Sequence, residues 1–424
     1  MTNIIAVCLI LLAGHTWAAT IDFDLEIKRL AQRPEIREAL RIIETLDSQS
    51  DAELIELTEI PAPPFKEGPR ARRYAEKLRA AGMLETEIDE EGNVISRWRG
   101  RTGKKTVALV AHLDTVFPEG TDVTVRREDG KLYAPGIGDD TRGLVLLLTM
   151  IRAMQAADVE TLDDLLFIGT VGEEGLGDLR GVKHLFRQGG PRIDEFIAID
   201  GGSFKRVLNR AIGSHRYRVT FRGAGGHSWS AFGLANPAHA LARTIHLFDQ
   251  NALVFVASGP RTTYNIGRIG GGTSVNAIPF ESWAEIDMRS EDPDRLRQID
   301  TILQNAVQQA LAEQNQRRTL GEPLSVEVKS IGNRPSGKID PQIPLIQRAL
   351  AATRFFGVTP ELAAGSTDAN VPIARGIPAT TIGRGGEGAG VHSLNEWWSN
   401  TDGFRGVQKA LLIALASAGV PVNR

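Results

Sequence analysis

The feature that most constrains this chain is an alternation of short apolar strands with helices, interrupted once by a segment of different rhythm. Apolar runs rich in β-branched residues predict strands at 106–110, 165–170 and 196–199, and an apolar helix is expected at 143–154. Strands that are apolar throughout and alternate with helices are typical of a sheet buried on both faces. The sequence therefore predicts an α/β unit with a mixed, largely parallel sheet and helices on both faces.

The interrupting segment has the pattern of a second, smaller unit. It predicts, in order, a half-exposed strand, a helix, two strands, a long amphipathic helix and a strand, at 216–221, 237–250, 263–268, 282–288, 293–314 and 325–329. The order β-α-β-β-α-β is that of a ferredoxin-like α+β domain. A helix at 343–356, a strand at 379–382 and a helix at 404–418 then return to the first pattern. We therefore expect residues 213–330 to be inserted between the two parts of one domain, 19–212 and 331–424.

Helices are also expected before the first strand. Residues 22–45 carry apolar side chains at helical spacing, and a second helix is expected at 69–81. Ser50 and Glu53 have the spacing of a capping box ahead of Leu54, which predicts that a helix begins at Ser50.

The N-terminal segment has the pattern of a secretory signal peptide. Residues 4–13 form an apolar run too short to cross a bilayer as a helix, and small residues surround a cleavage position after Ala18. The alternatives are a buried helix or a membrane anchor, and the first residues lack the usual Lys or Arg. We expect residues 1–18 to be removed and the mature chain to be secreted or periplasmic, without stable membrane association.

Charge and cysteine content exclude several classes of function. Lys and Arg total 49 against 52 Asp and Glu, which gives a net charge of −3 and no basic block of the kind that nucleic acid requires. Cys8 is the only cysteine and lies in the segment expected to be removed. Disulfides and thiolate metal clusters are therefore excluded, so that any metal site must use His, Asp and Glu.

Histidines and carboxylates gather where the predicted strands end. They are His112 and Asp114 after the first strand, Glu173 and Glu174 after the second, Asp200 after the third, Asp139 and Asp140 before the apolar helix, and His392 in a late glycine-rich loop. Taken singly, the first pair could be a surface pair, and Asp139 could cap the following helix. Together they form a mixed nitrogen and oxygen set that suits zinc or a similar divalent ion. Two ions can share such a set if one carboxylate bridges them, and can then activate a water and polarise a carbonyl.

Seven short motifs carry a resemblance to a known family. In chain order they read AHLDTV at 111–116, GIGDDTRG at 136–143, GEEG at 172–175, IDGG at 199–202, GGHS at 225–228, GGTSVNAIP at 271–279 and VHSLNEW at 391–397. From about Glu53 to its C-terminus the chain resembles the M20 family of dinuclear zinc metallopeptidases, the group of peptidase T and carboxypeptidase G2. The Asp-Asp-Thr-Arg sequence at 139–142 departs from the Asp-Asp-Lys frequent in peptidase T-like sequences.

The resemblance implies a metal centre of two Zn²⁺ ions, with Co²⁺ or Mn²⁺ as substitutes. His112 and Asp200 would bind one ion, Glu174 and His392 the other, and Asp139 would bridge them. It also implies that Asp114 orients His112 and that Glu173 is the general base.

The inserted domain would serve as a lid and mediate a homodimer. Within it His227 matches the histidine that stabilises the oxyanion, often from the partner subunit, and Asn276 and Arg289 lie where substrate polar groups are held. Arg289 could instead pair with Asp287 or Glu291. Weaker candidates are Arg384 and the stretch 366–370, and we expect the remaining histidines to be structural or exposed: His184, His215, His239 and His246.

The sequence thus predicts an exported hydrolase that cleaves amide bonds in short peptides, acting as an aminopeptidase or a carboxypeptidase. The alternative within the same chemistry is an N-acyl amino acid deacylase. A non-catalytic binding protein on the same fold is disfavoured, because Glu173 and all five expected ligands are present.

Overall fold

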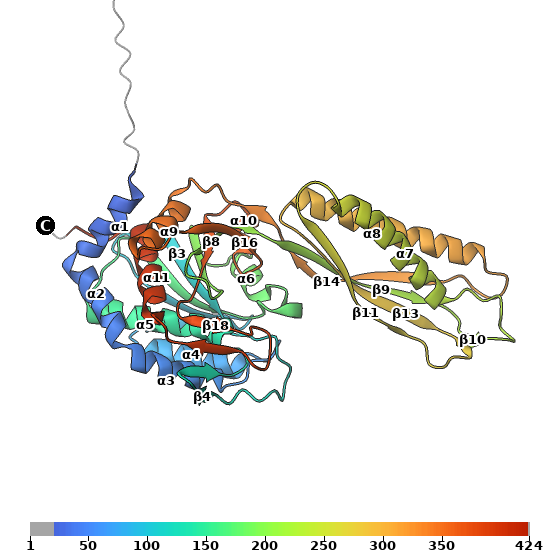
Figure 1. Cartoon of the computed structure of the whole chain (residues 1–424), viewed down its shortest axis with the longest axis horizontal. Helices are drawn as coiled ribbons and strands as arrows, with labels where there is room; N and C mark the ends of the chain where they lie inside the picture. Colours follow the sequence, from blue (N-terminus) through green and yellow to red (C-terminus); the bar gives the residue numbers. More distant parts are fainter. Residues whose placement is uncertain (1–20, 423–424) are drawn as a thin grey trace, which may run out of the picture.

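A nine-stranded mixed sheet forms the centre of the larger of two units (Figure 1). The computed structural model describes residues 21–422, so the predicted signal peptide and Cys8 lie outside the described residues. Across the sheet the strands follow the order β1 (Thr86–Ile88), β2 (Val94–Trp98), β6 (Asp164–Thr170), β3 (Thr106–His112), β7 (Glu195–Ile199), β17 (Ala379–Ile382), β8 (Arg206–Ala211) and β15 (Gly337–Lys338), with β16 (Glu361–Gly365) also against β8.

The middle of this sheet is parallel. Strands β6, β3, β7 and β17 run in one direction, whereas β2 and β8 flank them in the other. Every residue of β3 and β6 is buried, and both strands are apolar between their polar end residues, as expected for strands covered on both faces. The four parallel strands therefore bring their carboxyl ends to one edge of the sheet.

Helices cover both faces of the sheet. Helices α5 (Arg142–Ala156), α9 (Pro344–Phe355) and α11 (Gly403–Ala418) pack on one face and are backed by α1 (Phe23–Gln32) and α2 (Pro34–Thr45). Strands β6 and β7 lie on opposite sides of β3, so right-handed crossovers place α6 (Arg180–Leu185) on the face opposite α5. The remaining helices are α3 (Asp47–Thr58), α4 (Gly68–Ala80), α7 (Pro237–Val256), α8 (Pro293–Gln316) and α10 (Asn370–Ala374).

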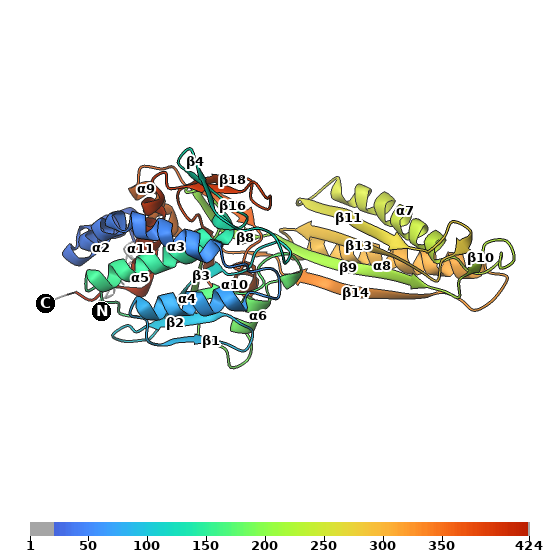
Figure 2. The ribbon, with the colours of Figure 1, turned by 90° about the horizontal axis from the view of Figure 1, so that it is seen from below.

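The smaller unit projects from one end of the larger (Figures 1 and 2). Its antiparallel sheet has the order β11 (Thr262–Gly271), β13 (Glu281–Ser290), β9 (Gly213–Arg222), β14 (Ser325–Arg334), and α7 and α8 pack on one face over a separate apolar core. The other face carries ion pairs between neighbouring strands, including Arg218 with Glu285 and Arg222 with Glu281. The predicted β-α-β-β-α-β order is observed, and the last strand continues to Arg334 instead of ending at 329.

Short strands complete the structure. Strands β18 (Glu387–Ala389), β19 (Trp397–Ser399), β5 (Lys131–Tyr133) and β4 (Arg126–Glu128) form a small antiparallel sheet, and β10 (Gly226–His227) pairs with β12 (Ala277–Ile278) in the smaller unit. The chain enters the smaller unit at Gly213, where an added Cβ would come within 2.8 Å of the carbonyl oxygen of Arg334. The two connections to the smaller unit therefore touch each other, and only glycine fits between them.

Two expectations for the N-terminal helices differ from the structure. The capping box is wrong: α3 begins at Asp47, three residues earlier, and Ser50 lies inside it with its Oγ accepting a hydrogen bond from Nη1 of Arg142 at 2.7 Å. Glu53 instead binds Nη2 of Arg152 at 2.6 Å. Both side chains bind arginines of α5, the buried Arg142 and the half-buried Arg152, and no local sequence pattern indicates these contacts. The helical stretch 22–45 is broken at Arg33, because Pro34 begins a new helix.

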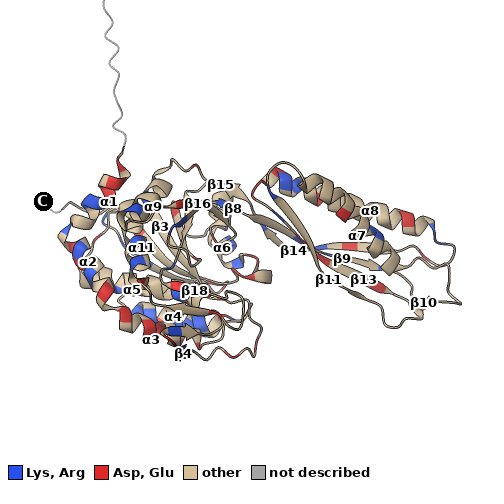
Figure 3. Cartoon of the chain, in the orientation of Figure 1, with Lys and Arg blue, Asp and Glu red and all other residues tan. Residues whose placement is uncertain are grey.

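Basic and acidic side chains are interspersed over both units (Figure 3), in agreement with the near-zero net charge. Among residues 21–422, no helix combines the length and the apolar character that a membrane crossing would need.

Candidate active site

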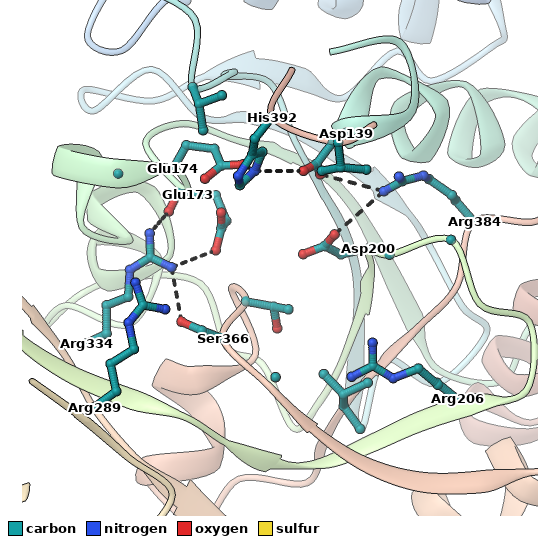
Figure 4. Close-up of a pocket in the computed structure, with 18 of the residues that line it drawn as sticks. Asp139, Glu173, Glu174, Asp200, Arg206, Arg289, Arg334, Ser366, Arg384 and His392 are labelled. Carbon is teal, nitrogen blue, oxygen red and sulfur yellow. Dashed lines mark hydrogen bonds and ion pairs between the residues drawn. The ribbon is translucent and has the colours of Figure 1, made fainter. Parts of the chain in front are cut away.

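The carboxyl ends of the four parallel strands gather the predicted histidine and carboxylates (Figure 4). His112 is the last residue of β3, Glu173 and Glu174 follow β6, and Asp200 follows β7. Arg384 follows β17 and reaches the same place. Polar groups meet here because the sheet ends and its apolar packing stops, which is where open α/β sheets bind ligands.

Asp139 lies between two histidines. Its Oδ1 is 3.3 Å from Nε2 of His112, and its Oδ2 is 3.1 Å from Nε2 of His392. His392 Nε2 is also 2.8 Å from Oε1 of Glu174. One carboxylate thus faces two imidazoles with its two oxygens, which is the arrangement that a bridging ligand requires.

The same side chains could hold divalent cations. Ligand atoms of His112, Asp139 and Asp200 lie within 4.8 Å of one another, as do those of Asp139, Glu174 and His392. The structure therefore brings together the five residues of the two predicted ligand sets, with Asp139 common to both. The set contains nitrogen and oxygen donors only, which suits zinc.

Buried charge at this site calls for a cation. Burial and the neighbouring Asp139 raise the pKa of Asp200 to about 6. The pKa of Asp139 lies well below its usual range although burial opposes this, because His112, His392 and Arg384 stabilise the carboxylate. Hydrogen bonds to Asp139 and Glu174 raise the pKa of His392 to about 10. Carboxylates that close together are stable only beside positive charge, so the residues fit a metal centre.

Backbone hydrogen bonds hold the Asp139 loop in place. The carboxylate of Glu396 accepts hydrogen bonds from the amides of Gly136, Gly138 and Asp139 at 2.8, 2.9 and 2.8 Å. Glu396 and His392 lie in the same loop between β18 and β19. That loop therefore supplies one side chain to the centre and fixes the position of another.

Asp114 contacts His112 mainly through its backbone. Nδ1 of His112 is 3.0 Å from the carbonyl oxygen of Asp114 and 3.6 Å from its carboxylate. The carboxylate of Asp114 accepts hydrogen bonds from the amides of Glu173 and Glu174, at 3.0 and 2.8 Å. Asp114 is thus placed to orient the two glutamates as well as the imidazole.

Glu173 is buried beside a cation from the smaller unit. Its Oε1 accepts a hydrogen bond from Nη1 of Arg334 at 3.1 Å, and its carbonyl oxygen contacts Nη2 of the same arginine. Burial raises the pKa of Glu173 well above its usual range, and the charge of Arg334 opposes this rise. A carboxyl group with a raised pKa is suited to accept and release a proton near neutral pH.

A cavity of about 500 Å³ opens in front of these groups. Arg289 lines it, and its Nε also donates a hydrogen bond to the neighbouring acid Asp287 at 2.7 Å. Ser366, Thr367 and Arg384 also line it. Sequence reasoning missed Arg206, Arg216 and Arg334, which line it too.

Two predicted residues lie away from this cavity. His227 is exposed in β10, Asn276 is exposed just before β12, and neither belongs to the cavity lining. Figure 1 shows β10 at the end of the smaller unit that lies farthest from the larger unit, which holds the candidate site. Within one chain, His227 and Asn276 therefore do not join the site.

The loop after Asp200 is held from behind by a buried lysine. Nζ of Lys409, in α11, donates a hydrogen bond to the carbonyl oxygen of Phe204 at 2.6 Å. Burial lowers the pKa of Lys409 to about 7. Lys409 thus anchors the segment that carries Asp200 without lining the cavity itself.

Comparison with known proteins gives one family and a set of distant relatives. The model of peptidase family M20/M25/M40 matches residues 108–415. Acetylornithine deacetylase of Myxococcus xanthus is 28% identical over 304 residues, which are 66% of this chain and 78% of that protein. Peptidase T of Shouchella clausii is 22% identical over 356 residues, 74% of this chain and 83% of that protein.

A solved structure shares the fold. The crystal structure of a tripeptidase from Staphylococcus aureus superimposes with a TM-score of 0.71, covering 88% of this chain and 99% of that one, at 22% sequence identity.

Proposed function

Because the chain belongs to peptidase family M20/M25/M40, as its motifs indicated, we propose that it is a dinuclear zinc exopeptidase acting on short peptides. Membership makes it a hydrolase of peptide or amide bonds. The observation that supports the finer proposal is the placement of Asp139 between His112 and His392, with the buried Glu173 beside them.

We assign the metal ligands as two sets that share Asp139. One set is His112 and Asp200, and the other is Glu174 and His392. Two divalent cations held there would supply Lewis acidity to the substrate carbonyl and lower the pKa of an attacking water. Co²⁺ or Mn²⁺ would be accepted in place of Zn²⁺.

Glu173 would move the proton. It would accept a proton from the attacking water and deliver it to the amide nitrogen as the bond breaks. Arg334 donates a hydrogen bond to this carboxylate and fixes its direction, and the charge of Arg334 opposes the rise in the pKa of Glu173 that burial causes.

An N-acyl amino acid deacylase is the second candidate. The relative from Myxococcus xanthus is an acetylornithine deacetylase, and its sequence identity of 28% over 304 residues compares with 22% over 356 residues for the peptidase T. Both reactions cleave an amide bond and need the same base and ligands, so only the substrate distinguishes them.

One assay separates these possibilities. Purified protein is incubated with unblocked dipeptides and tripeptides and with N-acetyl amino acids, before chelation, after chelation, and after Zn²⁺ is restored. We expect hydrolysis of unblocked peptides that chelation abolishes and Zn²⁺ recovers. Hydrolysis of N-acetyl amino acids alone would favour the deacylase, and hydrolysis that survives complete metal removal would contradict both.

We also propose that the protein is an exported homodimer. The far position of His227 supports a dimer, because an oxyanion donor there could act only on a neighbouring subunit's site. The signal-peptide pattern of residues 1–18 supports export; if cleavage occurs after Ala18, mature protein from the source cells should begin at Ala19 in the secreted or periplasmic fraction. A monomer by sedimentation, or a mature chain that retains residues 1–18, would contradict the respective proposals.

A further inference from the structure

Arg206 differs from the other arginines of the cavity. Arg216 and Arg289 pair with Asp287, Arg334 pairs with Glu173, and Arg384 faces Asp139 and Asp200. Among residues 21–422, Arg206 forms no ion pair within 4.0 Å, although it lines the same cavity. Its charge is therefore available to a bound molecule.

The guanidinium of Arg206 is held in a fixed position. Arg206 begins β8, is half-buried, and donates a hydrogen bond from Nη2 to the carbonyl oxygen of Ala364 at 2.8 Å. This bond uses one N–H group and leaves the remaining donors free. An arginine fixed in this way loses little conformational entropy when it binds a carboxylate through two N–H groups.

An open path leads from Asp200 to Arg206. Gly201 and Gly202 line the cavity between them in sequence, and a Cβ added to either would meet no atom within 4 Å. Leu208 lines the cavity two residues beyond Arg206 on the same strand and packs against Gly365. The path thus offers an apolar wall with a cation beside it, which matches a side chain of a few methylene groups ending in a carboxylate.

The side chains that line the cavity carry more positive than negative charges, which favours a substrate with a carboxylate. Five arginines line it against four carboxylates, which are Asp139, Glu173, Glu174 and Asp200. Figure 4 shows Arg206 on the Asp200 side and Arg289 on the opposite side, below Arg334. Two cations therefore face the centre from different directions.

We propose that Arg206 is a specificity-determining residue that binds a carboxylate on the substrate residue lying on the Asp200 side. The substrates would then be acidic peptides or acylated acidic amino acids, carrying a side-chain carboxylate in addition to the terminal one. This inference rests on the proposed amide hydrolysis and narrows its substrate class.

The test compares pairs of substrates that differ only in charge. The zinc-loaded enzyme is assayed with Glu-Ala and Gln-Ala, with Ala-Glu and Ala-Gln, and with N-acetylglutamate and N-acetylglutamine. We expect kcat/KM to favour glutamate over glutamine by about 10- to 100-fold in one pair, the effect of a charged hydrogen bond. In Arg206→Gln this ratio should fall close to one, and Arg206→Lys should keep part of it, because a single ammonium replaces the paired N–H groups.

Arg210→Gln is the matched control, since Arg210 lies on the same strand but pairs with Glu291 outside the cavity lining. Its ratio should equal that of the wild type. A wild type without preference for glutamate in any pair, or an unchanged preference in a folded Arg206→Gln variant, would overturn the inference. Should Arg206→Gln fail to fold, Arg206→Lys decides alone, and an unreduced ratio overturns the inference.

Binding separates this inference from the proposed function. If none of the pairs is hydrolysed, the panel of dipeptides, tripeptides and N-acetyl amino acids decides the proposed function separately, and calorimetry on the same zinc-loaded protein with these six compounds tests Arg206 directly. Tighter binding of the glutamate compound in one pair, lost in Arg206→Gln, would support the inference without catalysis. Equal binding within every pair would overturn it.

Discussion

Replacing Lys409 with methionine should stabilise the protein in a way that depends on pH. In the folded chain Lys409 is buried in α11 with one hydrogen bond, from Nζ to Phe204, and burial lowers its pKa from 10.5 to about 7. In the unfolded chain the ammonium is in water and keeps a pKa near 10.4. The unfolded state therefore binds more protons than the folded state between these values, and stability rises with pH across that window.

The size of the effect follows from the two pKa values. The difference between the folded and unfolded pKa values of Lys409 lowers the free energy of unfolding by about 5 kcal/mol well below pH 7. The loss is about 4 kcal/mol at pH 7 and about 2 kcal/mol at pH 9. Methionine does not titrate, so the variant lacks this pH-dependent loss of stability. It also leaves the carbonyl oxygen of Phe204 without its hydrogen-bond donor, which costs about 1–3 kcal/mol at every pH. The difference in free energy of unfolding between Lys409→Met and the wild type should therefore decrease by about 2 kcal/mol from pH 7 to pH 9.

Urea unfolding at pH 7, 8 and 9, followed by circular dichroism, measures this gap. Lys205→Met is the matched control, because Lys205 is exposed and pairs with Glu361; its stability should run parallel to that of the wild type. If the stability difference between Lys409→Met and the wild type stays constant from pH 7 to pH 9 within about 0.5 kcal/mol, the usual size of a surface effect, the lowered pKa of Lys409 is refuted.

Further predictions concern catalysis and assembly. Glu173→Gln should lower kcat by about 10²- to 10⁴-fold, because the proton acceptor is lost; its zinc content, measured by elemental analysis, should stay at the wild-type value, and near-normal turnover would contradict the mechanism. His392→Ala should lower zinc content in the same measurement, since an imidazole that contacts Asp139 and Glu174 is removed; unchanged metal content would exclude His392 as a ligand. Mixing inactive His227→Ala and Glu173→Gln subunits should restore part of the activity if His227 acts across the dimer, whereas no recovery after verified subunit exchange would count against action across the dimer.

The sequence predicted those parts of the structure that depend on local patterns. Strands β6 and β7 have apolar centres, and Glu173 and Asp200 follow them in the chain, so both carboxylates could be placed at one edge of the sheet from the sequence alone. The order of elements in the smaller unit was equally visible, because its strands alternate and its helices are amphipathic.

What could not be predicted depends on contacts between distant residues. Arg334 lies 161 residues from Glu173 and meets it only because β14 continues to the junction between the two units. Ser50 and Glu53 had the spacing of a cap, but two arginines of α5 bind their side chains instead. Arg206 has no motif around it, and its position matters only because β8 borders the cavity. In the first two cases the deciding partner is a charged side chain from another element, and in the third it is the position of the strand beside the cavity.

The place of β17 in the large sheet has a consequence for how the protein is made. Strand β17 lies between β7 and β8, and pairs Ile382 with Ile199 although the whole smaller unit separates them in the chain. β8 therefore leaves the ribosome long before β15, β16 and β17, all its partners in the sheet. At about 5–20 residues per second, β8 waits roughly 10–30 s for them. Residues 213–334 are complete before β15, β16 and β17 are made and can fold first, while the nascent larger sheet still presents open strand edges to any other chain nearby.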